Sequence, residues 1–353
     1  GQPLMEDLLC RMPERLLPWF ARYRRDLPWR RDRAPYHVWL SEIMLQQTRV
    51  EAVKGYYRRF LEQLPTIADL AQAEETQLLK LWEGLGYYSR VRNLQKAAQV
   101  IQREHGGVFP RDHSAIRALP GIGEYTAGAI SSICFDEKTP AVDGNVLRVV
   151  SRVLDDHSCT DDGKVKRRIS QNLREIYPEE AGDFTQALME LGATVCLPNG
   201  APKCESCPMG DLCLARQRGT IEELPVRREK RPRKQPNMTV FLLTGGDRTA
   251  LRQRPARGLL AGLYEFPHVD GVLSAQEAIR QAEAWGLHPR RLEKLVSRTH
   301  VFTHIQWNMT GVRIFCDREN REFLWADRET VGREIPLPTA FRQFLGDIWE
   351  EHG

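Results

Sequence analysis

The spacing of apolar residues changes once along this chain, and that change restricts the folds it can adopt. Up to about residue 215, apolar residues recur every three or four positions with Gly and Pro between segments, which predicts helices. After that the pattern is strand-like, because residues 238–243 form a largely apolar run and residues 305–310 alternate between apolar and polar. A helix is expected between these runs, over 275–285. We therefore expect an all-α domain followed by a smaller α+β domain.

The segment between the two patterns, residues 216–237, is strongly basic. From Arg216 to Lys234 it holds eight Lys or Arg and three Glu, a net charge of +5, whereas the whole chain carries +4. Such a segment can follow a phosphate backbone, or it can be an ordinary solvated run of charge. We interpret it as an interdomain linker between residues 1–215 and 238–353, to which repair or replication proteins would bind.

The composition gives no sign of a membrane or secreted protein. No apolar run approaches the roughly 20 residues that cross a bilayer. Met5, Glu6 and Asp7 open an amphipathic stretch rather than a signal peptide. We expect an intracellular monomer, cytoplasmic or nucleoid-associated if the source is a bacterium.

The distribution of the eight cysteines argues for one local metal site and against a disulfide framework. Four of them follow the spacing C-x7-C-x2-C-x5-C and the others are scattered; the four are Cys196, Cys204, Cys207 and Cys213. Four thiolates this close can bind zinc or a [4Fe–4S] cluster. Zinc sites usually combine two CxxC pairs, and here only Cys204 and Cys207 form one, so we favour the [4Fe–4S] cluster.

Residues 119–127 contain two glycines, Gly121 and Gly123, between helical segments. Such a turn exposes successive backbone N–H groups at the start of a helix, where a DNA phosphate can bind without regard to base sequence. A Gly-x-Gly pair alone usually marks an ordinary turn. The Leu-Pro before it and the Thr-Ala-Gly-Ala after it predict a helix–hairpin–helix that binds DNA.

Two acidic residues are candidates for catalysis. Glu42 falls on the apolar face of a helix expected over 35–60, although periodicity alone slightly favours a Glu that reaches solvent. A buried carboxyl group tends to stay protonated, which suits a general acid. Asp143 precedes a helix expected to end near Leu154, where it would cap the helix and stay ionised; most such residues are purely structural caps. Together they match an acid and an anionic stabiliser around an oxocarbenium-like transition state.

These motifs resemble two related families. Residues 30–215 resemble the endonuclease III superfamily of helix–hairpin–helix glycosylases, and the whole chain resembles the adenine DNA glycosylase family. The stretches that carry the second resemblance are SEIMLQQT at 41–48, LWEGLGYYSR at 81–90 and VDGNV at 142–146. The resemblance implies excision, by base flipping, of adenine mispaired with 8-oxoguanine or guanine in double-stranded DNA.

The same resemblance implies an architecture and residue roles. The helical domain would comprise a six-helix barrel at about 30–137 and a cluster part at 1–29 and 138–215. Glu42 would protonate N7 of the flipped adenine and help deliver water, and Asp143 would stabilise the sugar cation or attack it transiently. Further residues would contact the adenine or the DNA: Arg30, Leu45, Gly121, Gly123, Tyr125, Asn145 and Gln186.

Gln47 and Tyr87 would fill the gap that the flipped base leaves in the stack. Without the resemblance, Gln47 is simply a surface residue and Tyr87 a core aromatic. The second domain would be Nudix-like, and Phe302-Thr303-His304 resembles the Phe-Ser-His loop that recognises 8-oxoguanine, with the hydroxyl group retained at Thr303.

Three departures from the related families carry information. Tyr125 stands where bifunctional relatives place the Schiff-base Lys, so we expect a monofunctional glycosylase. The first cysteine gap is seven residues rather than the usual six, and we expect a bulged loop that keeps the cluster. Most Glu residues of a catalytic Nudix box are missing around 279–286, so the second domain should bind rather than hydrolyse. Two alternatives stay open: a pyrimidine-damage glycosylase/lyase, and a DNA-binding protein without catalysis.

Overall fold

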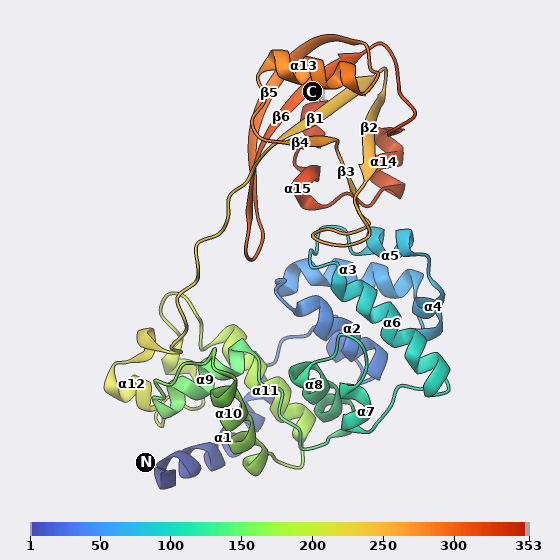
Figure 1. The fold of residues 1–353 in the computed structure, drawn as a ribbon. Helices are drawn as coiled ribbons and strands as arrows, with labels where there is room; N and C mark the ends of the chain where they lie inside the picture. The colour runs from blue at the N-terminus through green and yellow to red at the C-terminus, as the bar shows by residue number, and fades with distance from the viewer. Residues whose placement is uncertain (1, 350–353) are drawn as a thin grey trace. The chain divides into compact units, whose positions relative to one another are not determined.

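The computed structural model describes residues 2–349 and contains two compact units. The first unit comprises Gly1–Gln72 and Asn93–Glu229, and the second comprises Ala73–Arg92 and Lys230–Gly353. The first is helical, and the second contains the sheet (Figure 1). The expected fold class, an all-α domain followed by an α+β domain, is confirmed. Much of the expected linker belongs to the first unit, which extends to Glu229.

Helices account for the regular structure of the first unit. They are α1 (Gln2–Tyr23), η1 (Pro28–Arg30), α2 (Pro35–Leu45), α3 (Val50–Gln63), α4 (Ile67–Gln72), α7 (His113–Arg117), α8 (Glu124–Phe135), α9 (Gly144–Leu154), α10 (Gly163–Ile176), α11 (Ala181–Thr194), η2 (Cys204–Ser206), α12 (Leu214–Arg218) and η3 (Ile221–Glu223). Another helix, α6 (Ser89–Glu104), begins in the second unit and continues into the first.

The expectation of one helix over 35–60 is wrong, because the chain divides it into two. Helix α2 ends at Leu45 and α3 begins at Val50. Between them Gln47 has a φ of 61°, in the left-handed region that a right-handed helix cannot contain. Apolar residues continue at helical spacing across the break, so periodicity does not reveal it.

Helix α11 packs against α1, α8 and α9 and is central to the core of the first unit. Its residues Phe184, Leu188 and Leu191 are almost fully buried. They belong to the same apolar cluster as Leu16 of α1 and Val150 of α9. Burial of these side chains fixes the position of α11, and hence of the polar residues that α11 also carries.

Helix α9 begins where the sequence predicts. Asp143 occupies the N-cap, and its Oδ1 accepts a hydrogen bond from the Val146 N–H at 2.9 Å. The loop that leads to Asp143 lies tightly on α8 at Gly128. A Cβ atom on Gly128 would overlap the carbonyl oxygen of Pro140, so only Gly permits this approach.

The second unit is built around a mixed sheet with short helices. Its elements are α5 (Glu75–Leu81), β1 (Asn237–Gly245), β2 (Arg248–Gln253), β3 (Tyr264–Glu265), β4 (His268–Asp270), α13 (Ala275–Ala284), β5 (Pro289–Val301), β6 (Gln306–Cys316), β7 (Leu324–Asp327), α14 (Arg328–Glu334), α15 (Thr339–Arg342) and α16 (Leu345–Ile348). The strand order is β3-β2-β1-β6-β5, with β4 paired to β1 and β7 paired to β2. Strands β1 and β6 run parallel, and the other pairs are antiparallel.

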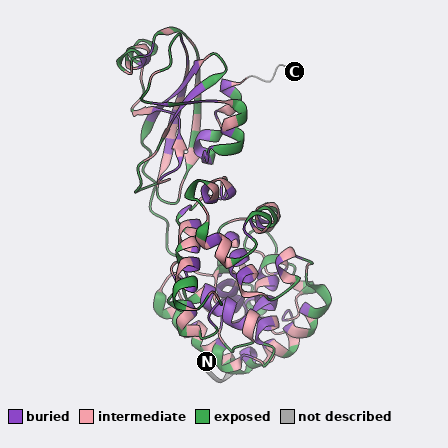
Figure 2. Cartoon of the chain, turned by 90° about the vertical axis from the view of Figure 1, so that its right-hand side faces the viewer, coloured by how far each residue is buried: buried purple, intermediate pink, exposed green. Residues whose placement is uncertain are grey.

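Both faces of this sheet are covered. Val240 and Leu242 of β1 pack in one apolar cluster with Phe341 of α15, whereas Phe241 and Leu243 pack in another with residues of α13. Because successive side chains of a strand point to opposite faces, a strand buried on both faces is continuously apolar. Figure 2 shows buried residues along these strands and in the interior of the helical unit.

No helix among residues 2–349 has the length and the apolar character required to cross a bilayer.

We expect Gly128→Ala to destabilise the first unit by about 1 to 3 kcal/mol, because the added methyl group must displace the Pro140 backbone. Urea unfolding followed by circular dichroism measures this change. Gly163→Ala, at the first turn of α10, is the control, since a Cβ there meets only the end of the Arg167 side chain at 3.4 Å. Equal stability of Gly128→Ala and wild type would contradict the tight approach.

Candidate active site

A cleft of about 1360 Å³ opens in the first unit. It brings together most of the residues that the sequence singled out for adenine contact and catalysis. Those that line it are Arg30, Glu42, Leu45, Gln47, Tyr125, Asp143, Asn145 and Gln186. They come from η1, α2, α8, α9, α11 and the adjoining loops, so the cleft depends on the packing of the whole unit.

The carboxyl group of Glu42 is buried in this cleft, with the residue 6% exposed. The Tyr125 hydroxyl donates a hydrogen bond to its Oε2 at 2.6 Å. Burial raises the pKa of Glu42 from 4.5 to about 7, an increase that the Tyr125 hydrogen bond opposes, Asp143 reinforces and Arg30 opposes. The apolar helix face therefore holds a carboxyl group that can give up a proton near neutral pH.

Tyr125 has a role that the sequence did not indicate. Its hydroxyl lies against Glu42 and also 3.1 Å from the Met189 sulfur. Burial and the neighbouring carboxyl groups raise the pKa of Tyr125 well above its ordinary value. The hydroxyl therefore stays protonated and acts as a fixed hydrogen-bond donor to Glu42.

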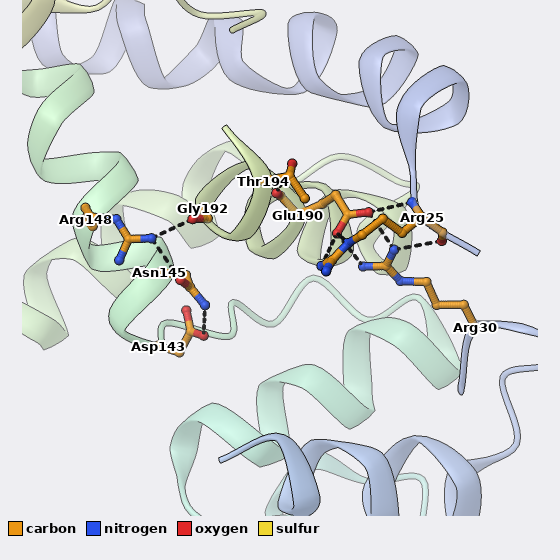
Figure 3. A network of polar contacts seen from close by, with 8 residues as sticks. All are labelled: Arg25, Arg30, Asp143, Asn145, Arg148, Glu190, Gly192 and Thr194. Carbon is orange, nitrogen blue, oxygen red and sulfur yellow. Dashed lines mark hydrogen bonds and ion pairs between the residues drawn. The ribbon is translucent and has the colours of Figure 1, made fainter. Parts of the chain in front are cut away.

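Asp143 lies at the start of α9, where its Oδ2 accepts a hydrogen bond from Asn145 Nδ2 at 3.2 Å. Asn145 is held in turn by Arg148, whose Nη2 donates to Asn145 Oδ1 at 3.0 Å and to the Gly192 carbonyl at 2.6 Å (Figure 3). Burial nevertheless raises the pKa of Asp143, even though its hydrogen bonds and Arg148 act to lower it. The expected cap is present, but it does not bring the pKa below the ordinary value.

Other residues at the cleft escaped the sequence analysis. Arg25 and Met189 line it directly, and Glu190 contacts two of its arginines from α11. Met189 and Glu190 lie three and four positions after Gln186, which places them near it on one side of a helix. That spacing is the sequence signal that could identify them.

Gln47 and Tyr87 share an unusual backbone. Their φ angles are 61° and 45°, and both side chains are exposed. Such φ values are rare for residues other than Gly and are often found at functional sites. Tyr87 is therefore not a core aromatic. In the second unit its hydroxyl lies 2.7 Å from the hydroxyl of Thr303.

The remaining residues of the predicted 8-oxoguanine loop lie between β5 and β6. Phe302 is partly buried, with its ring centroid 4.8 Å from that of Trp307. Thr303 and His304 are exposed. Packing of Phe302 against Trp307 anchors the loop, with the imidazole of His304 exposed and the hydroxyl of Thr303 hydrogen-bonded to Tyr87.

The predicted hairpin connects α7 to α8. Gly121 has a φ of 78° and is exposed, Gly123 is the N-cap of α8, and Ile122 between them is buried. Gly121 also lies close to α6, since a Cβ there would approach Asn93 Cβ to 2.6 Å. The N–H groups at the start of α8 are thus presented at an exposed turn, as phosphate binding requires.

The four clustered cysteines line one small cavity with Arg152 and Arg216. Within residues 2–349, no three His, Cys, Asp or Glu side chains are arranged to hold a single metal ion. Arg152 Nη1 lies 3.3 Å from Cys196 Sγ and backbone N–H groups face Cys207 and Cys213, as in a site that holds thiolates. Burial nevertheless raises the pKa of both thiols, to about 12 for Cys207, so a bound metal would have to stabilise the thiolate forms. The long first gap folds back through a hydrogen bond from Lys203 N–H to the Val195 carbonyl at 2.9 Å.

Comparison with known proteins agrees with this arrangement. Residues 40–175 match the HhH-GPD superfamily of base excision DNA repair proteins, and residues 239–347 match the NUDIX domain. The chain is 39% identical to the adenine DNA glycosylase of Rattus norvegicus, covering 96% of this chain and 77% of the rat protein. It is 30% identical to that of Buchnera aphidicola from Acyrthosiphon pisum, covering 95% of this chain and 97% of the relative.

The chain belongs to the adenine DNA glycosylase family. It is thus a DNA glycosylase, and the expected Nudix-like character of its C-terminal domain is confirmed. A solved structure of an endonuclease III–DNA covalent intermediate matches with a TM-score of 0.50 and 25% identity, over 59% of this chain and 94% of the other. The resemblance to endonuclease III is likewise confirmed.

Replacing Tyr125 with Phe should raise the pKa of Glu42 above its value of about 7, because the hydrogen bond that lowers it is lost. Loss of the proton from Glu42 would then require a higher pH. The alkaline limb of the pH profile for single-turnover base release should therefore move to higher pH in the glycosylase variant.

Tyr36→Phe is the matched control. It removes a different buried tyrosine hydroxyl, in α2, which donates to the Leu64 carbonyl at 2.7 Å and does not line the cleft. An alkaline limb that stays in place in Tyr125→Phe, or moves equally in both variants, would rule out this tuning of Glu42.

Proposed function

We propose that this glycosylase hydrolyses the N-glycosidic bond of adenine mispaired with 8-oxoguanine or guanine in double-stranded DNA. The observation that carries the proposal is the pairing of two carboxyl groups, Glu42 and Asp143, in one cleft with different hydrogen-bond partners. The names of the relatives support adenine as the base. The Nudix-like domain with its Phe302-Thr303-His304 loop supports recognition of the opposite base.

The reaction begins when the adenine leaves the stack and enters the cleft. Glu42 transfers its proton to N7, which makes adenine a better leaving group, and the bond between C1′ and N9 breaks with its electron pair going to the base. Asp143 stabilises the resulting sugar cation as a carboxylate. Water then adds its oxygen to C1′ and returns one proton to Glu42. The products are free adenine and an abasic sugar.

Strand cleavage does not follow in this scheme. A lyase step requires an amine that forms a Schiff base with the sugar, and Tyr125 offers a hydroxyl group at that place in the hairpin. That hydroxyl is already bonded to Glu42. We therefore assign Tyr125 to tuning the acid, and the enzyme to monofunctional hydrolysis.

The other exposed residues would hold the DNA around this reaction. The turn of Gly121 and Gly123 would bind a phosphate through backbone N–H groups. Gln47 and Tyr87 would fill the space beside the orphaned base. Leu45, Gln186 and Arg30 would surround the adenine, and Asn145 would hold Asp143. The basic residues that follow residue 216 would add affinity for the duplex or recruit repair partners.

Single-turnover adenine release from duplexes with one A:8-oxoguanine or A:G pair tests the function. We expect release by the wild type and a loss of about 100-fold or more in Glu42→Gln, which keeps the shape but not the proton. Binding of the A:8-oxoguanine duplex should stay nearly unchanged. Glu62→Gln, on the exposed side of α3, is the control and should act as the wild type.

Two results would refute the proposal. If the wild type binds the duplex but releases no adenine, the chain is a DNA-binding protein without this activity. If it nicks DNA efficiently at oxidised pyrimidines without added base or heat, the glycosylase/lyase alternative is correct.

Cys196, Cys204, Cys207 and Cys213 would hold a [4Fe–4S] cluster, which would tie the C-terminal loop of the helical domain to α9 and α11. We expect an absorption band at about 400 nm and iron with acid-labile sulfide in the purified protein. Cys204→Ser should lose the band, and Cys10→Ser, on the exposed surface of α1, should keep it. Stoichiometric zinc with no band would show that the site binds zinc instead.

A further inference from the structure

Glu190 is a buried carboxylate of α11 that no step of the proposed reaction uses. Its side chain is 1% exposed. Arg25 donates to it from Nε at 2.9 Å, from Nη2 at 2.7 Å and from the backbone N–H at 2.7 Å. Arg30 donates from Nη1 at 2.8 Å and from Nη2 at 3.2 Å. Figure 3 shows both guanidinium groups directed at this one carboxylate.

These bonds fasten the segment between α1 and α2 onto α11. Arg30 Nη1 also donates to the Arg25 carbonyl at 3.2 Å, so backbone and side chains of the segment are tied together. The same segment supplies Leu27, Trp29 and Arg30 to the wall of the cleft. Glu190 does not line the cleft, so its effect on a bound base must pass through these residues.

The charge of Arg30 also acts on Glu42. The groups that face Glu42 are the Tyr125 hydroxyl and the Cys134 thiol of α8, Asp143 at the start of α9 and Arg30 of η1. Among these Arg30 is the cation, and it stabilises the ionised form of Glu42. Glu190 offsets that cation and holds it in one place. Burial acts to raise the pKa of Glu190, but the hydrogen bonds from Arg30 and Arg25 lower it below its ordinary value.

We propose that Glu190 is a positioning residue for base excision, which fixes Arg30 at the cleft and limits the effect of its charge on Glu42. This inference rests on the proposed function. A buried carboxylate bound by two guanidinium groups is costly to maintain for stability alone, since an apolar group of similar size often serves as well. The contact of Glu190 with Arg30 at the cleft gives a functional reason for keeping this carboxylate.

The test uses Glu190→Gln in the full chain. We expect the single-turnover rate of adenine release to fall by about 100-fold, because Arg30 is no longer held in position at the cleft. The alkaline limb of its pH profile should move to lower pH, because the charge of Arg30 is no longer offset and favours the ionised form of Glu42. Glu190→Asp keeps the charge, so its limb should stay near the wild-type position even if its rate is lower.

Asp183→Asn is the matched control. It removes another carboxylate of α11 that pairs with an arginine near the start of α2, Arg33, at 2.5 Å, but this pair is exposed and away from the cleft. Its rate and pH profile should equal those of the wild type. Circular dichroism establishes that each variant is folded.

A double-mutant cycle separates positioning from general stability. If Glu190 acts through Arg30, Glu190→Gln should add little further loss in an Arg30→Ala background. The inference fails if Glu190→Gln matches the wild type in rate and pH profile, or if its loss is the same in both backgrounds. In those cases adenine release by the wild type still supports the proposed function, whereas no release by the wild type refutes that function instead.

Discussion

The burial of one carboxyl group, that of Glu42, is the constraint on which the rest of the active site depends. A carboxyl group in an apolar environment favours its neutral form. The chain places Glu42 on the inner face of α2, and it supplies one hydroxyl donor, one neighbouring carboxylate and one guanidinium group around it. Tyr125, Asp143 and Arg30 belong to three different elements. Their positions relative to Glu42 are therefore set by how the helices pack.

That dependence explains why α11 is central to the molecule. It contributes apolar residues to the core, Met189 to the surroundings of Tyr125, and Glu190 to the surroundings of Arg30. Because one helix carries both core and site residues, a substitution that shifts its packing also moves the residues at the site. Gly192 shows how closely α11 packs against α9, since a Cβ there would approach Asn145 Cβ to 2.8 Å.

The sequence was sufficient to predict the parts of the fold and site that depend on local pattern. The change in periodicity predicted a helical domain followed by an α+β domain, and the Asp-Gly-Asn motif predicted the cap of α9. Helical phase placed Glu42 on the apolar face of its helix, although periodicity alone slightly favoured a Glu that reaches solvent, and the structure shows it buried. Each of these follows from residues near one another in the chain, where spacing translates directly into geometry.

Contacts between distant segments were not predictable in the same way. The bond from Tyr125 to Glu42 joins residues 83 positions apart, and the pairing of Arg25 with Glu190 spans 165. The break between α2 and α3 was not predictable from the sequence, because it lies at Gln46, Gln47 and Arg49, which leave the helical conformation without a Gly or Pro among them. The raised pKa of Asp143 was not predictable for a related reason, since the cap is local but the burial that outweighs it comes from tertiary packing.

The left-handed backbone at Gln47 and Tyr87 has a consequence for engineering this enzyme. Glycine would adopt both conformations without strain, so a search for thermostable variants should select it at either position. Each gain would remove a side chain that is held outward before any DNA arrives. A selection on folding free energy alone would therefore favour the loss of the two side chains that we propose to fill the space beside the orphaned base.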